Sequence, residues 1–194
     1  MKSNERYRAE HVRPARRIVV KVGTNVLAPA QEPGGGLDED RVRSLVDQIA
    51  ALVKEGRQVA LVTSGAIGCG MAALGPGRSP GTLPGRQAAA SVGQGLLMAH
   101  YSRHFQRHGI HAAQILLTHE DLDERRRYLD AANTIHALFE LSCVPVINEN
   151  DSISTEEIKF GDNDRLAALV THLVRAELLI LLTSVPGLYK TPPQ

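Results

Sequence analysis

Two short runs of carboxylate and amide side chains have the residue types needed to bind a polar substrate. One run, Asn-Glu-Asn-Asp at 148–151, directly follows the apolar segment 144–147, and the other, Asp-Asn-Asp, occupies 162–164. Carboxylates can hold an ammonium group, and amides can orient a polar acceptor through hydrogen bonds. Each run alone could be a loop or a helix cap. Because both runs flank one short segment, 153–160, we interpret them together as a binding site.

A lysine and a glycine near the start of the chain could serve a phosphate group. Lys21 lies one residue before the end of the β-branched run 17–22, and Gly23 follows that run. A lysine there places an ammonium at the end of a strand, and glycine lets the backbone approach a phosphate closely. The alternative is an edge lysine that only reaches solvent.

Ser64, Gly65 and Ala66 form a third candidate, at an expected strand-to-helix turn. The N–H groups at the start of a helix favour an anion such as a carboxylate. The alternative is that Ser64 only caps the helix. The spacing matches neither the nucleophile turn of hydrolases nor the glycine-rich loop of P-loop nucleotide-binding proteins, so neither of those site types is supported.

The elements that must position these side chains alternate along the chain. Apolar and β-branched runs predict buried strands, which we expect at 17–22, 59–62, 112–117, 143–147 and 178–182. Apolar residues at helical spacing predict the helices between them, which we expect over 38–55, just after 65, over 86–107, after a cap at Asp130, and from 164 onward. In the helix over 86–107, we expect Ala89, Val92, Leu96 and Ala99 on one face.

Strands that alternate with helices indicate right-handed βαβ units and the α/β class. Continuous apolar strands fit a mostly parallel sheet that helices cover on both faces, which is a three-layer αβα sandwich. In such sheets ligands bind beyond the carboxyl ends of the strands. This rule selects the segments 23–25, 63–66, 148–151 and 183–184.

Length and composition suit one globular domain. The chain has 194 residues, is 43% hydrophobic and 22% charged, and carries a net charge of +1. The basic excess lies in residues 1–17, which we interpret as a flexible arm that precedes a domain over 18–194. The arm lacks the interleaved aromatic residues of a nucleic-acid-binding segment. No apolar run reaches the roughly 18 residues of a membrane span, so we expect a cytoplasmic protein without nucleic-acid or membrane partners.

Neither the cysteines nor the histidines have the spacing of a metal site. Cys69 and Cys143 lie in apolar contexts, where reduced thiols serve packing. His100, His104 and His108 recur at helical spacing, which we interpret as the outer face of a helix rather than as metal ligands.

Five motifs together resemble the glutamate 5-kinase family of the amino acid kinase superfamily. They are Val-Val-Lys-Val-Gly-Thr at 19–24, Val-Thr-Ser-Gly-Ala-Ile at 62–67, Ser-Val-Gly-Gln at 91–94, Val-Pro-Val-Ile-Asn-Glu-Asn-Asp at 144–151 and Phe-Gly-Asp-Asn-Asp at 160–164. The resemblance runs in order from about residue 17 to residue 189. Kinases for other acceptors share the first strand and its glycine turn but not the last two motifs, so that pair makes the resemblance specific.

The resemblance implies an enzyme that phosphorylates the γ-carboxylate of L-glutamate with ATP and Mg2+. The product is L-glutamyl 5-phosphate, and the reaction is the first step of proline biosynthesis. The resemblance also implies a homo-oligomer.

The same resemblance implies roles for single residues. Lys21 matches the catalytic lysine that contacts the nucleotide phosphates, and Asp164 matches the aspartate that positions the catalytic lysines. The residues that match glutamate-binding positions are Ser64, Gly65, Ala66, Asp151 and Asn163. Those that match ATP contacts, besides Lys21, are Gly23, Thr183 and Ser184.

The chain departs from the family pattern in two places. The family usually has Thr-Asp after the fifth strand, where this chain has Thr183 and Ser184. The family's nucleotide-binding lobe, with a glycine-rich segment and a second lysine, follows the point where residue 194 stands. We therefore expect a truncated chain that holds the acceptor-binding lobe, with low activity alone. The alternatives are a non-catalytic glutamate- or proline-binding module, a truncated pseudoenzyme, or an amino acid kinase with another acceptor.

Overall fold

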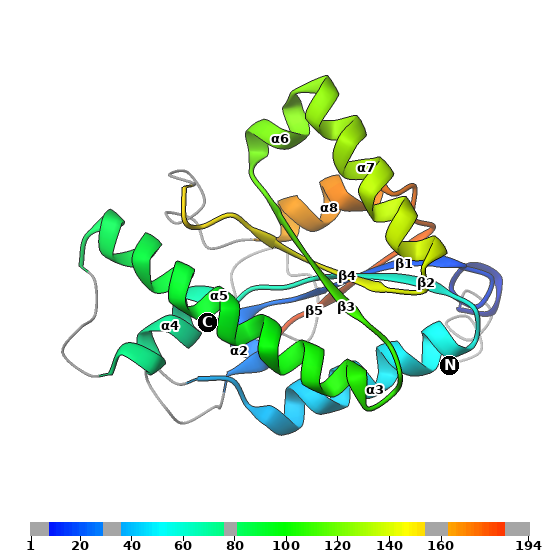
Figure 1. Cartoon of the computed structure of the whole chain (residues 1–194). Coiled ribbons are helices and arrows are strands. Elements are labelled where there is room, and N and C mark those ends of the chain that lie inside the picture. Colours follow the sequence, from blue (N-terminus) through cyan, green and yellow to red (C-terminus); the bar gives the residue numbers. More distant parts are fainter. Residues whose placement is uncertain (1–7, 29–35, 76–80, 154–162, 185–194) are drawn as a thin grey trace, which may run out of the picture.

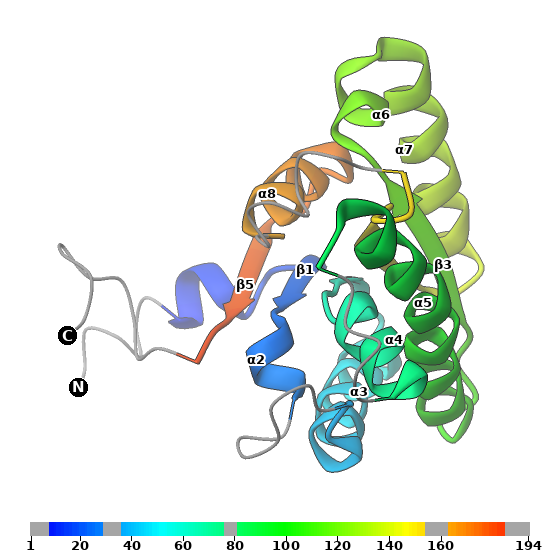
Figure 2. The same ribbon diagram turned by 90° about the vertical axis from the view of Figure 1, so that its left-hand side faces the viewer.

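The structure is a computed structural model that describes residues 8–28, 36–75, 81–153 and 163–184. Within them, five strands form one sheet in the order β3-β4-β2-β1-β5, and each pair of neighbours is parallel. The strands are β1 (Arg17–Val22), β2 (Gln58–Val62), β3 (Ala112–Leu117), β4 (Val144–Glu149) and β5 (Leu178–Leu182). Figure 2 shows β3 and β5 at opposite sides of the sheet.

Helices cover both faces of this sheet. Figure 1 shows α6 (His119–Asp123), α7 (Arg125–Glu140) and α8 (Asp164–Leu173) above it, and α3 (Glu39–Lys54), α4 (Ala66–Leu74) and α5 (Leu83–Gln106) below it. The remaining helical elements among the described residues are short, namely η1 (Arg8–Val12) and α2 (Thr24–Leu27). The predicted three-layer αβα sandwich is confirmed, and its sheet is entirely parallel within the described residues.

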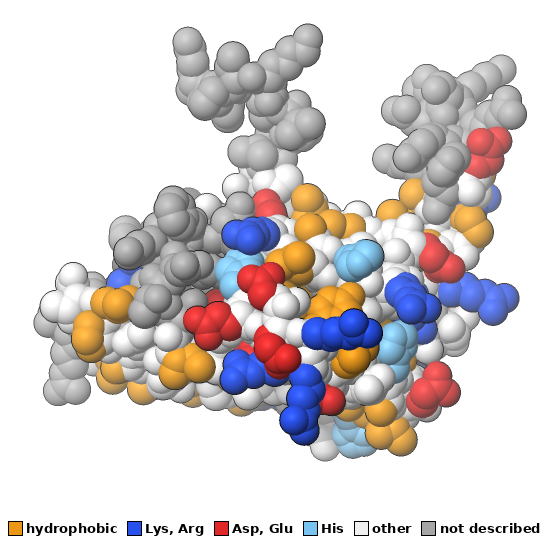
Figure 3. Space-filling model, turned by 90° about the horizontal axis from the view of Figure 1, so that it is seen from above, with side chains coloured by type: hydrophobic (Ala, Val, Ile, Leu, Met, Phe, Trp, Pro, Cys, Tyr) orange, Lys and Arg blue, Asp and Glu red, His pale blue; other side chains and the backbone are white. Residues whose placement is uncertain are grey.

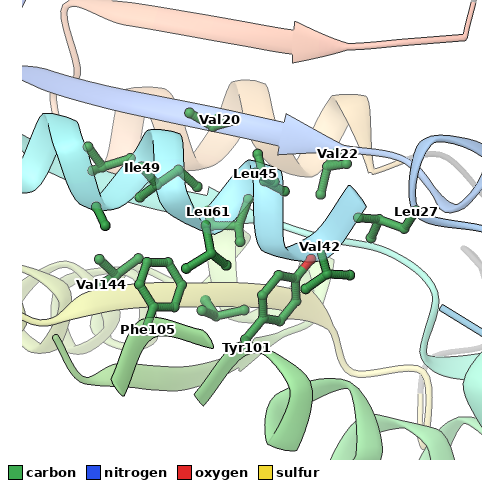
Figure 4. Close-up of a cluster of buried hydrophobic side chains, with 14 of the residues drawn as sticks. Val20, Val22, Leu27, Val42, Leu45, Ile49, Leu61, Tyr101, Phe105 and Val144 are labelled. Carbon is green, nitrogen blue, oxygen red and sulfur yellow. The ribbon is translucent and has the colours of Figure 1, made fainter. Parts of the chain in front are cut away.

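Side chains of the central strands point alternately to the two faces of the sheet, so each helix layer packs on its own hydrophobic core. Val20 and Val22 of β1 face the side of α3 and α5, where Tyr101 and Phe105 point toward Leu61 (Figure 4). Val19 faces the opposite side, with apolar residues of α7 and α8. Fully burying one such side chain contributes about 1.5–3 kcal/mol, so the two cores fix the strand ends relative to the helices.

Helix α5 differs from the sequence-based prediction in its start and in its buried face. It begins at Leu83, and the Thr82 hydroxyl accepts from the Gly85 N–H at 3.3 Å. Val92 and Leu96, which we expected on one face of this helix, are 43% and 40% exposed, so they do not contribute to the core.

The cause is the close approach of α4. A Cβ on Gly93 would overlap the Ala66 carbonyl oxygen, and a Cβ on Gly70 would overlap that of Ala89. The smallest residues therefore face α4, which turns the branched side chains toward solvent.

Three further boundaries differ from the prediction. Helix α7 begins at Arg125, capped by the Glu124 carboxylate rather than by Asp130, and α6 before it was not predicted. Helix α6 has a capping box between Thr118 and Asp121. Strand β4 continues through Asn148 and Glu149, and the Asn148 side chain finds a buried partner in Gln94 inside the sheet layer.

The three histidines do not form an outer helix face. His104 is 4% exposed, and its Nε2 lies 2.7 Å from Glu39 at the start of α3. The His100 Nδ1 lies 2.6 Å from the same carboxylate, and the His108 Nε2 lies 2.7 Å from Asp47. The histidines therefore join α5 to α3, and the prediction is wrong because charged partners on α3 were not visible in the spacing.

The end of the basic arm belongs to the fold. Arg17 begins β1, and its Nε donates to the Gln58 side chain at 2.8 Å. Its guanidinium lies 5.3 Å from the centroid of the Phe139 ring. Arg17 is therefore part of strand β1, and residues 1–7 lie outside the described part of the chain.

Both cysteines are free thiols. Cys69 is buried, and burial raises its pKa to about 11, which suits the predicted packing role. Cys143 is half-buried. Among the described helices, none is both long and apolar enough to cross a membrane. Figure 3 shows the face above α6, α7 and α8, where acidic and basic side chains are interspersed.

Candidate functional site

The carboxyl ends of β1, β2 and β4 bring the predicted site residues together at one edge of the sheet. Lys21 of β1 is paired in register with Val62 of β2, and Val62 with Ile147 of β4. The residues that follow these positions therefore lie side by side. This is the edge at which open parallel sheets bind ligands.

Lys21 and Asp164 form the charged part of this edge. The Lys21 Nζ lies 2.5 Å from the Asp164 Oδ1, and the two side chains are 12% and 48% exposed. Asp164 is the first residue of α8, where the helix dipole favours a negative charge. The pair holds an ammonium at the strand ends while leaving one side of the aspartate open to solvent.

Asn163 connects α8 to the turn after β2. Its side chain is not a helix cap, although it stands at the N-cap position. Its Nδ2 instead donates to the Thr63 carbonyl oxygen at 2.6 Å and lies 2.9 Å from the Ser64 Oγ. A third acceptor, the Asn148 Oδ1, lies 3.0 Å away. Asn163 is 8% exposed, so these contacts hold it in place.

The turn that carries Ser64 depends on Gly65. Gly65 has φ +105°, a left-handed conformation that residues with a side chain rarely adopt. It occupies the N-cap position of α4, and no side chain caps that helix. The alternative that Ser64 only caps α4 is therefore wrong. Ser64 faces Asn163 instead, and Ala66 begins the helix as a buried residue.

Asp151 lies on the same edge, in the turn that follows β4. It is partly buried, and the Asn150 N–H before it donates to the Leu117 carbonyl oxygen at 2.9 Å. The structure therefore places Asp151 beyond the strand end, as predicted. Asp162, the first residue of the second polar run, lies outside the described residues.

Gly23, Thr183 and Ser184 lie at the neighbouring strand ends. Val22 and Leu182 are paired in register, so Gly23 and Thr183 follow adjacent strands. Thr183 and Ser184 are exposed. Gly23 has φ −87°, and a Cβ there would lie 3.6 Å from the Lys21 Nζ. Neither the conformation nor the space thus requires glycine at this position.

Several buried polar side chains around the site were missed as individual site residues. The Asn148 Nδ2 donates to the Gln94 Oε1 at 2.9 Å, and the Gln94 Nε2 donates to the Gln114 Oε1 at 3.2 Å. The Tyr101 hydroxyl lies 2.7 Å from the Thr63 Oγ1. Gln94 is an amide on the apolar face of a helix, and that contrast was the signal that could have identified it.

These buried groups have little access to solvent. Asn148 is 1% exposed, Glu149 3% and Thr63 0%. Burial raises the pKa of Tyr101, so its hydroxyl stays protonated and able to donate at neutral pH. The site therefore rests on buried amide and hydroxyl groups, together with the Glu149 carboxylate, beneath the Lys21–Asp164 pair.

No group of three or more His, Cys, Asp or Glu side chains that could hold a metal ion occurs among the described residues. Magnesium sites in proteins can share their oxygen ligands with a bound substrate. Such sharing is usual for Mg2+, which binds through one or two carboxylates together with substrate phosphates and waters.

Comparison with known proteins agrees with this geometry. The sequence model of the amino acid kinase family matches residues 16–194. The glutamate 5-kinase of Thermobifida fusca is 53% identical over 186 residues, which cover 96% of this chain and 47% of that protein. That of Streptomyces coelicolor is 52% identical over 179 residues, covering 92% and 47%. That of Salinispora arenicola is 50% identical over 184 residues, covering 95% and 49%.

These matches confirm the resemblance that the five motifs indicated. The chain spans about half the length of the curated relatives it matches.

Proposed function

Because this chain belongs to the amino acid kinase family, we propose that it carries the acceptor site of an enzyme that phosphorylates the γ-carboxylate of L-glutamate with ATP. The relatives named above are glutamate 5-kinases. The product of the proposed reaction is L-glutamyl 5-phosphate, in the first step of proline biosynthesis. We place this reaction in the cytoplasm and expect a homo-oligomer, which light scattering of the purified protein tests.

One observation carries the proposal. The Asp164 Oδ1 lies 2.5 Å from the Lys21 Nζ, and the Nδ2 of the preceding residue, Asn163, lies 2.9 Å from the Ser64 Oγ. The proposed phosphate-binding cation and the proposed substrate-binding amide are therefore neighbours. Phosphoryl transfer needs this arrangement, because positioning and charge stabilisation supply most of its catalysis.

The residues of this chain would act mainly through charge. Both reactants are anions, and the glutamate carboxylate is already a nucleophile that needs no general base. Lys21 would neutralise charge on the transferring phosphoryl group. Asp164 would keep the ammonium at the strand ends, and it would act as an organiser rather than as a proton acceptor.

The remaining site residues divide into an acceptor side and a nucleotide side. Ser64, Gly65 and Ala66 offer a hydroxyl and backbone N–H groups to a carboxylate, while Asp151 and Asn163 hold the rest of glutamate. Gly23, Thr183 and Ser184 would contact ATP, which supplies the phosphoryl group. Mg2+ would bind together with the nucleotide, in keeping with the preference of this ion for shared phosphate ligands.

A calorimetric titration with Asp151→Ala tests the acceptor side. Loss of a partly buried charged partner should weaken L-glutamate binding by at least about tenfold. Asp123→Ala removes an exposed carboxylate from α6 and serves as the matched control, with unchanged affinity expected.

The outcomes separate the competing functions. Binding of L-glutamate without binding of ATP would favour a non-catalytic module. Tighter binding of aspartate or acetylglutamate than of glutamate would favour a kinase for another acceptor. Equal affinity of Asp151→Ala and the unchanged chain would remove Asp151 from the site.

A further inference from the structure

A chain of side-chain amides runs from Gln114 on β3, through Gln94 on α5, to the substrate edge. Asn163 donates to Asn148, Asn148 donates to Gln94, and Gln94 donates to Gln114, at 3.0, 2.9 and 3.2 Å. We call these four residues the amide relay. Asn163, Asn148 and Gln94 are at most 8% exposed. They come from the N-cap of α8, from β4 and from α5, so the relay joins these elements at the site.

Backbone groups fix the direction of the relay. The Glu149 N–H can only donate, and it donates to the Asn148 Oδ1 at 2.9 Å. The Asn148 Nδ2 must then face Gln94, so the Gln94 Oε1 must face Asn148. A side-chain amide can normally be assigned in either of two flipped orientations. Here each flip would set like atoms against each other.

The other end of the relay has a second backbone anchor. The Thr63 carbonyl oxygen can only accept, and it accepts from the Asn163 Nδ2 at 2.6 Å. Among the described residues, every hydrogen bond of the Asn163 side chain uses Nδ2. The Asn163 Oδ1 is therefore the amide atom left for a ligand, and it is an acceptor.

We propose that Gln94 is a positioning residue that sets the orientation of Asn148 and, through it, presents the Asn163 Oδ1 to the α-ammonium group of an amino acid substrate. Gln94 itself lies in α5 and contacts Asn148 rather than the substrate. This inference rests on the proposed function, because it names the substrate group that one site residue recognises.

The expected consequence is selectivity for the ammonium group. Glutarate has both carboxylates of glutamate and lacks only its α-ammonium. An acceptor oxygen held toward that position favours glutamate, because the oxygen remains without a donor when glutarate binds. Disturbing Gln94 should therefore weaken glutamate binding and leave glutarate binding almost unchanged.

The test compares Gln94→Met and Gln94→Glu with Gln106→Met as the matched control. Met keeps the length of Gln but has no amide, so the Asn148 Nδ2 loses its acceptor. Glu keeps an acceptor for Asn148 and should restore part of the effect. Gln106 is an exposed glutamine near the end of the same helix. NMR titrations with L-glutamate and with glutarate measure both affinities for each variant of the chain.

We expect Gln94→Met to weaken glutamate binding about tenfold, with glutarate affinity within about twofold of the unchanged chain. Gln94→Glu should fall between Gln94→Met and the unchanged chain, and Gln106→Met should match the unchanged chain. Equal loss for both ligands, or no loss for glutamate, would overturn the positioning role.

A ligand-free readout separates this inference from the proposed function. In the unchanged chain, the side-chain NH2 protons of Asn148 and Asn163 should exchange with solvent more slowly than those of Gln106. Gln94→Met should speed the exchange at Asn148. If exchange behaves in this way but L-glutamate does not bind, the proposed function fails and the relay stands. If Asn148 exchanges as fast as Gln106 in the unchanged chain, the relay itself is wrong.

Discussion

Helix α5 carries two polar clusters that differ in charge and in purpose. The amide relay is neutral, buried at Gln94, Asn148 and Asn163, and directed toward the strand ends, where Gln94 meets Asn148. The second cluster, which we call the histidine cluster, consists of Glu39, His100 and His104, and it joins α5 to α3. Both clusters fix the same helix, but only the relay lies against the candidate substrate site.

The comparison shows that one helix can make hydrogen bonds that do not depend on pH beside contacts that do. Amides do not titrate, so the relay keeps its hydrogen-bond direction at any pH at which the protein is folded. A carboxylate does titrate, and the pKa of Glu39 is lowered in the fold, so the Glu39 contacts of the histidine cluster change with pH. Removing one hydrogen-bonding side chain from the relay should also lower the free energy of unfolding more, because the polar groups that lose their partner are buried.

The largest effect is expected for Asn148→Leu. The side chain is 1% exposed and bonds with Gln94, Glu149 and Asn163. Its removal leaves buried polar groups without partners, and the free energy of unfolding should fall by about 3 kcal/mol. Urea unfolding measures this loss, which should be the same at pH 6 and pH 8. A loss below about 0.5 kcal/mol would show that the relay contributes nothing to stability.

Tyr101→Phe should have an intermediate effect. It removes only the hydroxyl that lies 2.7 Å from the Thr63 Oγ1. The Thr63 Oγ1 also lies 3.1 Å from the Ser64 carbonyl oxygen, so it retains one partner. We expect a loss of about 1 kcal/mol in the same urea experiment. A loss as large as that of Asn148→Leu would mean that this hydroxyl, rather than the amides, organises the turn at 63–65.

Glu39→Gln should have the smallest effect at neutral pH. Its side chain is 44% exposed, and solvent screens ion pairs of this kind, so we expect a loss below about 1 kcal/mol. The hydrogen bond with His104 is the main cause that lowers the Glu39 pKa from 4.5. A lowered pKa means that the folded state binds fewer protons than the unfolded state. The stabilisation is therefore complete above about pH 4.5 and is lost as the pH falls further.

Unfolding measured from pH 6 to pH 3 checks the sign of this effect. The stability of the unchanged chain should fall toward that of Glu39→Gln as Glu39 becomes protonated. Parallel curves over the whole range would contradict the assignment of this acid-sensitive term to the histidine cluster.

The sequence was informative about strands and less informative about which side chains face which partner. Apolar runs predicted all five strands of the described sheet, because a parallel sheet covered on both faces needs continuous apolar segments. The pairing of Ser64 with Asn163 depends on a turn and a helix start that are far apart in the chain. The family resemblance named both residues, although periodicity alone could not bring them together.

The misassigned helix face has a physical cause. Spacing alone put Val92 and Leu96 on a shared apolar face, but the close α4–α5 contact at Gly70 and Gly93 turns another face inward. That rotation buries Gln94 and His104. The relay and the histidine cluster were therefore hidden by the same error, since both depend on which residues of α5 face the molecule.

Mapping L-glutamate onto the chain by NMR tests the account most directly. Titration should shift the amide signals of Ser64, Gly65 and Asn163 and leave those of His104 and His108 unchanged. This result would place the acceptor at the strand ends, beside the relay. The absence of shifts at Ser64 and Asn163, or shifts centred on the histidine cluster, would contradict the account.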